Sequence, residues 1–159
     1  MIRNATSQDF SFFYRLYMHP EINPYLLYEL MDEASFAPIY EELLRSGVLY
    51  VFEDQGQSAG MFKFIPLQHR TDHIAYLGGL AIAPEFAGKG LALSMFDAIF
   101  ELAASKQIRR IELSVATHNH RAIRLYEKVG FQVEGILKNY THLKSEGRFI
   151  DEQLMARIT

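Results

Sequence analysis

The stretch "LAIAPEFAGKGLALSMFDAIFELA", residues 80–103, joins a strand-like apolar segment to a long helix-like one through two glycines. The glycines lie in "AGKGLA", residues 87–92. Glycines at this spacing let a backbone turn sharply and approach a phosphate closely. A helix that starts directly after the turn also offers unpaired amides and a favourable dipole to an anion. The stretch predicts a strand, a tight turn and a helix that could hold a pyrophosphate, although an ordinary strand-to-helix turn explains the glycines equally well.

Two familiar phosphate-binding motifs do not fit this turn. A nucleotide P-loop requires a glycine where Ala83 stands, and Ser or Thr where Gly90 stands. The dinucleotide fingerprint requires a third glycine where Leu93 stands. The turn therefore predicts an anion site outside these two classes.

The composition indicates one globular domain over residues 1–159. A net charge of −3 argues against nucleic acid as a partner, and no apolar run is long enough to span a membrane. There are no cysteines, which excludes disulfides, thiolate metal sites and a cysteine nucleophile. No secretory signal opens the chain, so the expected location is cytoplasmic. His118 and His120 lack acidic or cysteine partners in the sequence, so we expect no metal site.

Hydrophobic periodicity and turn signals predict an α/β (α+β) fold, with a mixed sheet of about seven strands flanked by about four helices. Predicted strands cover residues 2–5, 48–54, 59–67, 72–82, 109–115, 131–143 and 148–158. Predicted helices cover residues 6–19, 33–45, 91–106 and 119–129.

Several local signals support these boundaries. Thr6 and Asp9 form a capping-box pattern, and Gly47 is placed to end the second helix. The sequences "QGQS" and "KSEG" predict two hairpin turns. Inside the fourth strand, the pair Gly78–Gly79 indicates a bulge or a close approach by another backbone.

A second informative stretch is "THNHRAIRLYEKVGF", residues 117–131. Asn119 is placed to cap a helix, Tyr126 lies two turns later, and Gly130 ends the helix before Phe131 starts a strand.

Together, residues 80–103 and "IELSVATHNHRAIRLYEKVGF", residues 111–131, resemble the GCN5-related N-acetyltransferases (GNAT). That family follows a strand, a glycine pyrophosphate loop and a long helix with a strand and a helix ending in Tyr-x-x-x-Gly-Phe. The resemblance implies a mostly antiparallel sheet. The ending "EGILKNYTHLKSEGRFIDEQLMARI", residues 134–158, is similar to the RimJ/RimL ribosomal-protein and polyamine acetyltransferase branches.

The resemblance implies an enzyme that uses acetyl-CoA as acetyl donor, and it assigns roles to individual residues. The pantetheine arm would pair with Leu80, Ala81 and Ile82 and contact Asn119, and Tyr126 would be the general acid beside the leaving sulfur. A backbone N–H near Leu80 would polarise the thioester carbonyl. The pyrophosphate would be held by Ala87, Gly88, Lys89, Gly90, Leu91 and Ala92. Alternative roles are a helix cap for Asn119, a packing aromatic for Tyr126 and a solvated side chain for Lys89.

One residue departs from the family pattern. The family's loop reads Gln/Arg-x-x-Gly-x-Gly/Ala; Gly90 and Ala92 match its end, but Ala87 occupies the Gln/Arg position. A side-chain contribution to the loop is missing, while its backbone amides do not depend on side-chain identity. Weaker cofactor binding is the expected consequence.

The acceptor is expected to be a primary amine, of a small molecule or a peptide N-terminus, acetylated by direct transfer in a ternary complex. Its site would involve residues 20–36, an acidic and aromatic segment that suits a cationic or amphipathic amine, and the last two strands. Aromatic residues of the first helix, among them Tyr17, would line the core or this site. Candidate general bases are left open among His73, Tyr76, Glu112, Glu29, Asp32 and Glu33.

Two rival functions are a CoA-binding sensor or regulator without turnover, which Ala87 supports, and a purely structural domain with both motifs accidental. By analogy with the family, a homodimer through the last strands is also expected.

Overall fold

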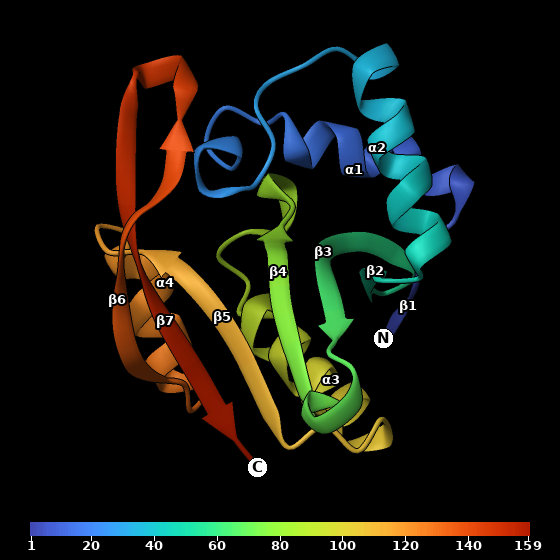
Figure 1. Cartoon of the computed structure of the whole chain (residues 1–159). Helices are drawn as coiled ribbons and strands as arrows, with labels where there is room; N and C mark the ends of the chain where they lie inside the picture. Colours follow the sequence, from blue (N-terminus) through green and yellow to red (C-terminus); the bar gives the residue numbers. More distant parts are fainter. The chain divides into compact units, whose positions relative to one another are not determined.

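The structure is a computed structural model that describes residues 1–159. Seven strands form a mostly antiparallel sheet in the order β1-β2-β3-β4-β5-β7-β6, accompanied by four α-helices (Figure 1). The predicted fold class and order of elements are confirmed. The elements are β1 (Ile2–Asn4), α1 (Phe10–Tyr17), α2 (Glu33–Ser46), β2 (Leu49–Asp54), β3 (Gln57–Pro66), β4 (Ile74–Ile82), α3 (Leu91–Ser105), β5 (Arg110–Ala116), α4 (His120–Lys128), β6 (Gln132–Leu143) and β7 (Arg148–Ile158).

The chain divides into two compact units, each of which is described by itself. The first unit comprises residues 1–64 and 79–100, and the second comprises residues 65–78 and 101–159. No helix has the length and the apolar character that crossing a membrane would require.

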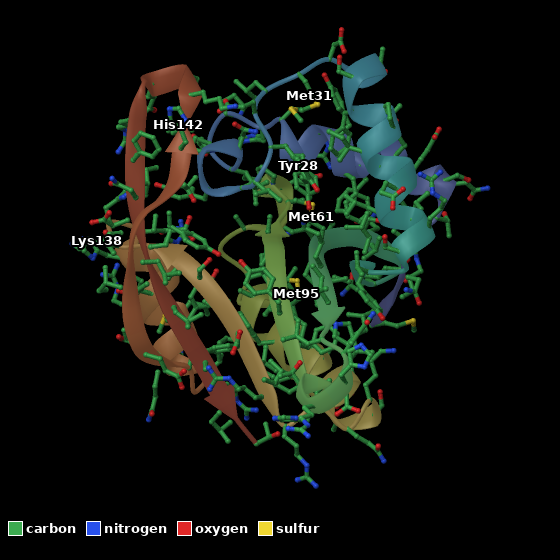
Figure 2. All side chains as sticks on the ribbon, in the orientation of Figure 1. Tyr28, Met31, Met61, Met95, Lys138 and His142 are labelled. Carbon is green, nitrogen blue, oxygen red and sulfur yellow. The ribbon has the colours of Figure 1, made fainter.

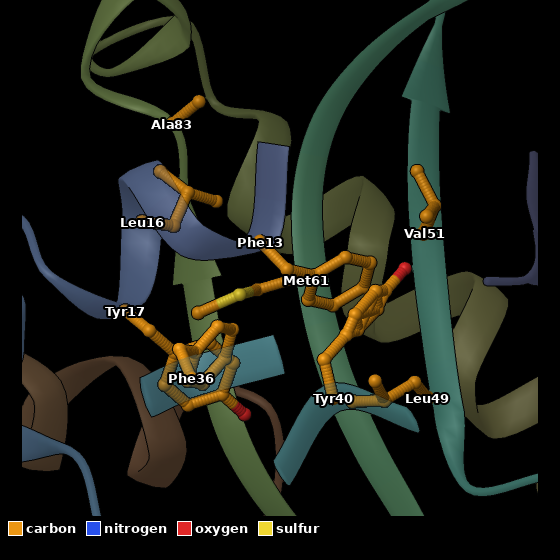
Figure 3. Packing of buried hydrophobic residues seen from close by; sticks show 9 residues of the cluster. All are labelled: Phe13, Leu16, Tyr17, Phe36, Tyr40, Leu49, Val51, Met61 and Ala83. Carbon is orange, nitrogen blue, oxygen red and sulfur yellow. The ribbon is translucent and has the colours of Figure 1, made fainter. Parts of the chain in front are cut away.

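In the first unit, helices α1 and α2 pack against β2 and β3 through a largely aromatic core (Figure 3). Alternate residues of a strand face opposite sides, so Leu49 and Val51 of β2 and Met61 of β3 share the face that the helices cover. Each fully buried large side chain stabilises the fold by about 1.5–3 kcal/mol. This core consists of Phe13, Leu16, Tyr17, Phe36, Tyr40, Leu49, Val51, Met61 and Ala83.

The start of α1 confirms the capping box, with one difference. The Thr6 hydroxyl accepts a hydrogen bond from the amide of Gln8, and the Asp9 carboxylate accepts one from the amide of Thr6 at 2.8 Å. The capped residues form a 3-10 turn, Ser7–Asp9, so the α-helix itself begins only at Phe10. Asp9 also accepts two hydrogen bonds from Arg3, which binds β1 to this turn.

The hairpin between β2 and β3 is tighter than "QGQS" predicted. Only Gln55 and Gly56 form the loop, with φ of 49° and 77°, and β3 already begins at Gln57. Two consecutive residues with positive φ match the twist of the flanking strands, so two residues suffice to reverse the chain.

In the second unit, β6 and β7 form a long antiparallel hairpin, and β5 pairs antiparallel with β7 (Figure 1). A turn over residues 144–147 joins β6 to β7, with Gly147 at φ 61°, which confirms the "KSEG" prediction. The first residues of β4 pair in parallel with β5, from Ile74 opposite Arg110 to Tyr76 opposite Glu112. Sequence alone did not distinguish this parallel pair from the antiparallel ones.

Candidate functional site

The glycine turn of the first unit has the predicted strand–turn–helix form. After β4, a 3-10 turn over Pro84–Phe86 leads to Gly88 and Gly90, with φ of 76° and 73°, and α3 begins at Leu91. A Cβ atom at either glycine would meet no other atom within 4 Å. The two glycines are therefore required by backbone conformation, not by close packing.

The backbone amides of this turn are largely free to donate. Ala87 N–H donates to the carbonyl of Pro84 at 3.1 Å, and Leu93 N–H donates to that of Gly90 at 3.2 Å. No turn, loop or cap hydrogen bond uses the amides of residues 88–92. A run of such amides at a helix start favours binding of an anion. The side chain of Lys89 lies over the Phe86 ring, 5.4 Å from its centroid.

An ion pair connects this turn to α1. Arg15 donates two hydrogen bonds to the carboxylate of Glu85, at 3.0 and 2.8 Å. Both side chains are nearly half exposed, so the pair contributes at most about 1 kcal/mol. Its two-point geometry nevertheless orients the 3-10 turn ahead of Gly88.

The glycine pair within β4 marks a close approach, as predicted, but the approaching group is a side chain. Gly79 has φ of 55°, and a Cβ atom there would lie 2.5 Å from the Tyr17 hydroxyl oxygen. The neighbouring residues Leu80–Ile82 complete β4 and are partly buried. Pairing of β4 with β5 ends at Tyr76, before the glycines.

In the second unit, Asn119 caps α4 as predicted. Its side-chain oxygen accepts a hydrogen bond from the amide of Ala122 at 3.3 Å, which leaves the side-chain N–H₂ group outside this cap. Tyr126 lies further along α4, with its ring 6.1 Å from that of Phe131. Burial, with a smaller effect from Tyr76, raises the pKa of Tyr126 to about 12. The phenol is therefore protonated at neutral pH, as a general acid must be.

Three of the candidate bases have structural partners. Glu112 accepts a hydrogen bond from Arg110 at 2.8 Å, and Asp32 caps α2 by accepting one from the amide of Ser35. The hydroxyl of Tyr76 lies 3.2 Å from that of Ser114, and burial raises the pKa of Tyr76. These interactions favour positioning roles over proton abstraction.

The structure also draws attention to Lys63, which sequence reasoning missed. Lys63 lies on β3 between Phe62 and Phe64 and is only 6% exposed. Its ammonium group lies 5.0 Å from the centroid of the Tyr28 ring and 3.4 Å from the Tyr28 hydroxyl. A lysine flanked by phenylalanines in an apolar strand was the available sequence signal.

Residues 80–92 belong to the first unit, and Asn119 and Tyr126 belong to the second. Each group has its own local geometry: a turn with free amides beside a glycine-containing strand, and a capped helix that carries a partly buried tyrosine.

Comparisons with known proteins identify chains that are similar to this one. The profile of the acetyltransferase (GNAT) family matches residues 8–131. A Bacillus subtilis protein provisionally named a ribosomal protein bS18-alanine N-acetyltransferase is 37% identical over 103 residues, 64% of this chain and 66% of the relative. The Escherichia coli L-amino acid N-acetyltransferase AaaT is 31% identical over 90 residues, 56% of this chain and 54% of the relative. The chain thus spans about half to two thirds of the length of the curated relatives it matches.

The fold is shared with solved structures along the whole chain. A Vibrio cholerae spermidine N-acetyltransferase in complex with CoA and spermine superposes with a TM-score of 0.86 at 24% identity, covering 99% of this chain and 94% of the other. A Brucella melitensis ribosomal-protein-alanine N-acetyltransferase superposes with a TM-score of 0.81 at 23% identity, covering 100% and 99%. With the family profile matched across most of its length, the chain belongs to the GNAT acetyltransferase family.

Proposed function

We propose that this protein is an acetyl-CoA-dependent N-acetyltransferase that acts on a primary amine of a small molecule or a peptide N-terminus. The observation that carries the proposal is the run of unused amides over residues 88–92 at the start of α3, in a chain of this family. The names of the relatives support an amine acceptor, since they specify alanine of ribosomal proteins, L-amino acids and spermidine.

The donor would be held mainly by backbone groups. The amides of residues 88–92 would bind the pyrophosphate of acetyl-CoA, with charge added by Lys89. The Ala87 amide already donates to Pro84, so this residue would shape the turn more than it binds. The backbone of Leu80, Ala81 and Ile82 would pair with the pantetheine arm, and the free side-chain N–H₂ of Asn119 would donate to it.

The transfer itself would occur in a ternary complex. The neutral amine forms a C–N bond with the thioester carbonyl carbon, and the C–S bond then breaks. An N–H group near Leu80 stabilises the negative charge that develops on the carbonyl oxygen. The CoA thiolate takes the phenol proton of Tyr126, and the proton released by the amine restores the phenol.

The decisive experiment is a calorimetric titration with acetyl-CoA, followed by a screen of amines for release of free CoA thiol. We expect micromolar binding, roughly 8 kcal/mol. Tyr126→Phe should lower kcat about 100-fold or more while cofactor affinity is kept. Tyr50→Phe, which removes a phenol oxygen from the first unit's β2, is the matched control.

Other outcomes identify the rival functions. Binding of acetyl-CoA without turnover on any amine would favour the CoA-binding sensor. No binding at millimolar acetyl-CoA would refute the acetyltransferase proposal.

We further propose that the protein forms a homodimer through β6 and β7. These strands expose Val133, Ile136, Tyr140 and Phe149, each about half exposed, on a hairpin whose β6 lies at the sheet edge. Light scattering coupled to size-exclusion chromatography tests this: a monomeric mass at micromolar concentration would contradict it.

A further inference from the structure

Lys63 is a buried cation without an anionic partner. It is 6% exposed, it forms none of the ion pairs in the molecule, and its one hydrogen bond is the long contact with the Tyr28 hydroxyl. Lysine is rarely this buried unless it is paired, because desolvation of an ammonium group is costly. Burial accordingly lowers the pKa of Lys63. Such a group in a native fold needs a reason beyond packing.

A second buried polar group, which also lacks a suitable partner, lies beside Lys63. The Tyr17 hydroxyl is fully buried and has no hydrogen-bond partner. It lies 2.5 Å from the position a Cβ atom of Gly79 would take, and the Cε atom of Lys63 lies 3.3 Å from the same position. The Tyr17 hydroxyl and the side chain of Lys63 therefore both lie against Gly79, next to the residues proposed to pair with pantetheine.

The surrounding loop fixes this arrangement. Asn23 is buried, and its side-chain N–H₂ group donates to the carbonyls of both Tyr17 and Tyr28 at 2.8 Å. The rings of Tyr17 and Tyr28 lie 5.4 Å apart, and Figure 2 shows Tyr28 near Met61 within this unit. Tyr28 keeps partial exposure, so the group reaches the surface on its side. The donors are held in place before any ligand binds.

We propose that Lys63, with the hydroxyls of Tyr17 and Tyr28, forms a binding site for a carboxylate, and that the acetyl acceptor is therefore an α-amino acid or a close analogue. The inference rests on the proposed acetyltransferase function and specifies its substrate class. A carboxylate provides acceptor oxygens and a negative charge. The Tyr17 hydroxyl lacks an acceptor, and the Lys63 ammonium group lacks an anionic partner.

The same charge argues against the cationic acceptor that the acidic segment, residues 20–36, suggested. A polyamine placed near Gly79 would meet the Lys63 ammonium, and like charges in a desolvated site repel strongly. Among the acids of that segment, Asp32 is engaged in capping α2, and none forms an ion pair with Lys63. The charge that faces Gly79 is therefore positive.

The experiment compares each L-amino acid with its C-terminal amide, which keeps the amine and the side chain but removes the carboxylate. We expect the wild type to prefer at least one amino acid over its amide by about 10- to 100-fold in kcat/KM. Lys63→Met should abolish this preference by raising KM for the amino acid, with the amide rate and the acetyl-CoA affinity kept. Lys106→Met, which removes an exposed ammonium, is the matched control.

Two further measurements test whether Lys63→Met still folds and whether Lys63 has a different role. Thermal unfolding should show Lys63→Met at least as stable as the wild type, since it removes a buried unpaired charge, and Tyr17→Phe gives a second variant that removes one oxygen. An equal loss of kcat with acid and amide would place Lys63 at the acetyl oxygen and overturn the carboxylate site. So would a wild type that binds acetyl-CoA but prefers amides, peptides or spermidine, whereas absence of acetyl-CoA binding would overturn the proposed function itself.

Discussion

Replacement of Gly79 by alanine tests the close contact at the centre of the first unit. Gly79 has φ of 55°, where an alanine costs about 1–2 kcal/mol. The added Cβ would lie 2.5 Å from the buried Tyr17 oxygen and 3.3 Å from Cε of Lys63, and such overpacking costs about 1–3 kcal/mol. Together, Gly79→Ala should lower the free energy of unfolding by about 2–5 kcal/mol.

Removal of the Tyr17 hydroxyl separates the two contributions. With Tyr17→Phe, the nearest ring atom is Cζ at 3.5 Å, which is ordinary van der Waals contact. Because that hydroxyl has no partner, Tyr17→Phe alone should change stability by less than about 1 kcal/mol. The double variant should therefore recover most of the overpacking part and retain the conformational cost of about 1–2 kcal/mol, together with the 3.3 Å contact to Lys63 Cε.

Urea unfolding of the four proteins, followed by circular dichroism, measures this coupling. A coupling of about 1–3 kcal/mol between the two substitutions supports the geometry. If the two effects simply add, or if Gly79→Ala is neutral, the hydroxyl does not lie against Gly79 and Tyr17 does not belong to the carboxylate site.

Three further predictions concern other parts of the molecule. Asp9→Asn should lower stability by about 2–3 kcal/mol at neutral pH. Arg3 holds the pKa of Asp9 below its usual value of 3.8, so this contribution is present above that pH and is lost as pH falls through the lower, folded-state pKa; unfolding curves at pH 7 and pH 3 should show the difference shrink. Gly90→Ala, at φ 73° in open space, should cost about 1 kcal/mol and weaken acetyl-CoA binding, whereas Gly135→Ala, without positive φ, should be near neutral by the same assays. Because burial raises the pKa of Tyr126 to about 12, kcat should not fall between about pH 8 and 10; an alkaline decline in that range that disappears in Tyr126→Phe would contradict this assignment.

Local signals in the sequence predicted most of the secondary structure, because they depend on neighbouring residues only. Thr6 and Asp9 mark the first helical turn, Gly47 ends α2 with φ of 67°, and Asn119 caps α4. The errors in the predicted boundaries were also local: α1 begins after a 3-10 turn, and the first hairpin loop has two residues instead of four. The two motifs around Gly90 and Tyr126 were sufficient to identify the family.

Tertiary structure alone decided which side chains meet and with what charge. The phenylalanines beside Lys63 mark an apolar strand, but the sequence does not show that this cation is unpaired, since its neighbours Tyr17, Tyr28 and Gly79 come from separate segments. The acidic residues of the segment 20–36 suggested a cationic acceptor. In the structure, however, Asp32 caps α2, and the Lys63 ammonium group has no anionic partner. Backbone conformation follows from residues adjacent in the chain, whereas desolvation and pairing of charges depend on contacts that form only when distant segments pack together.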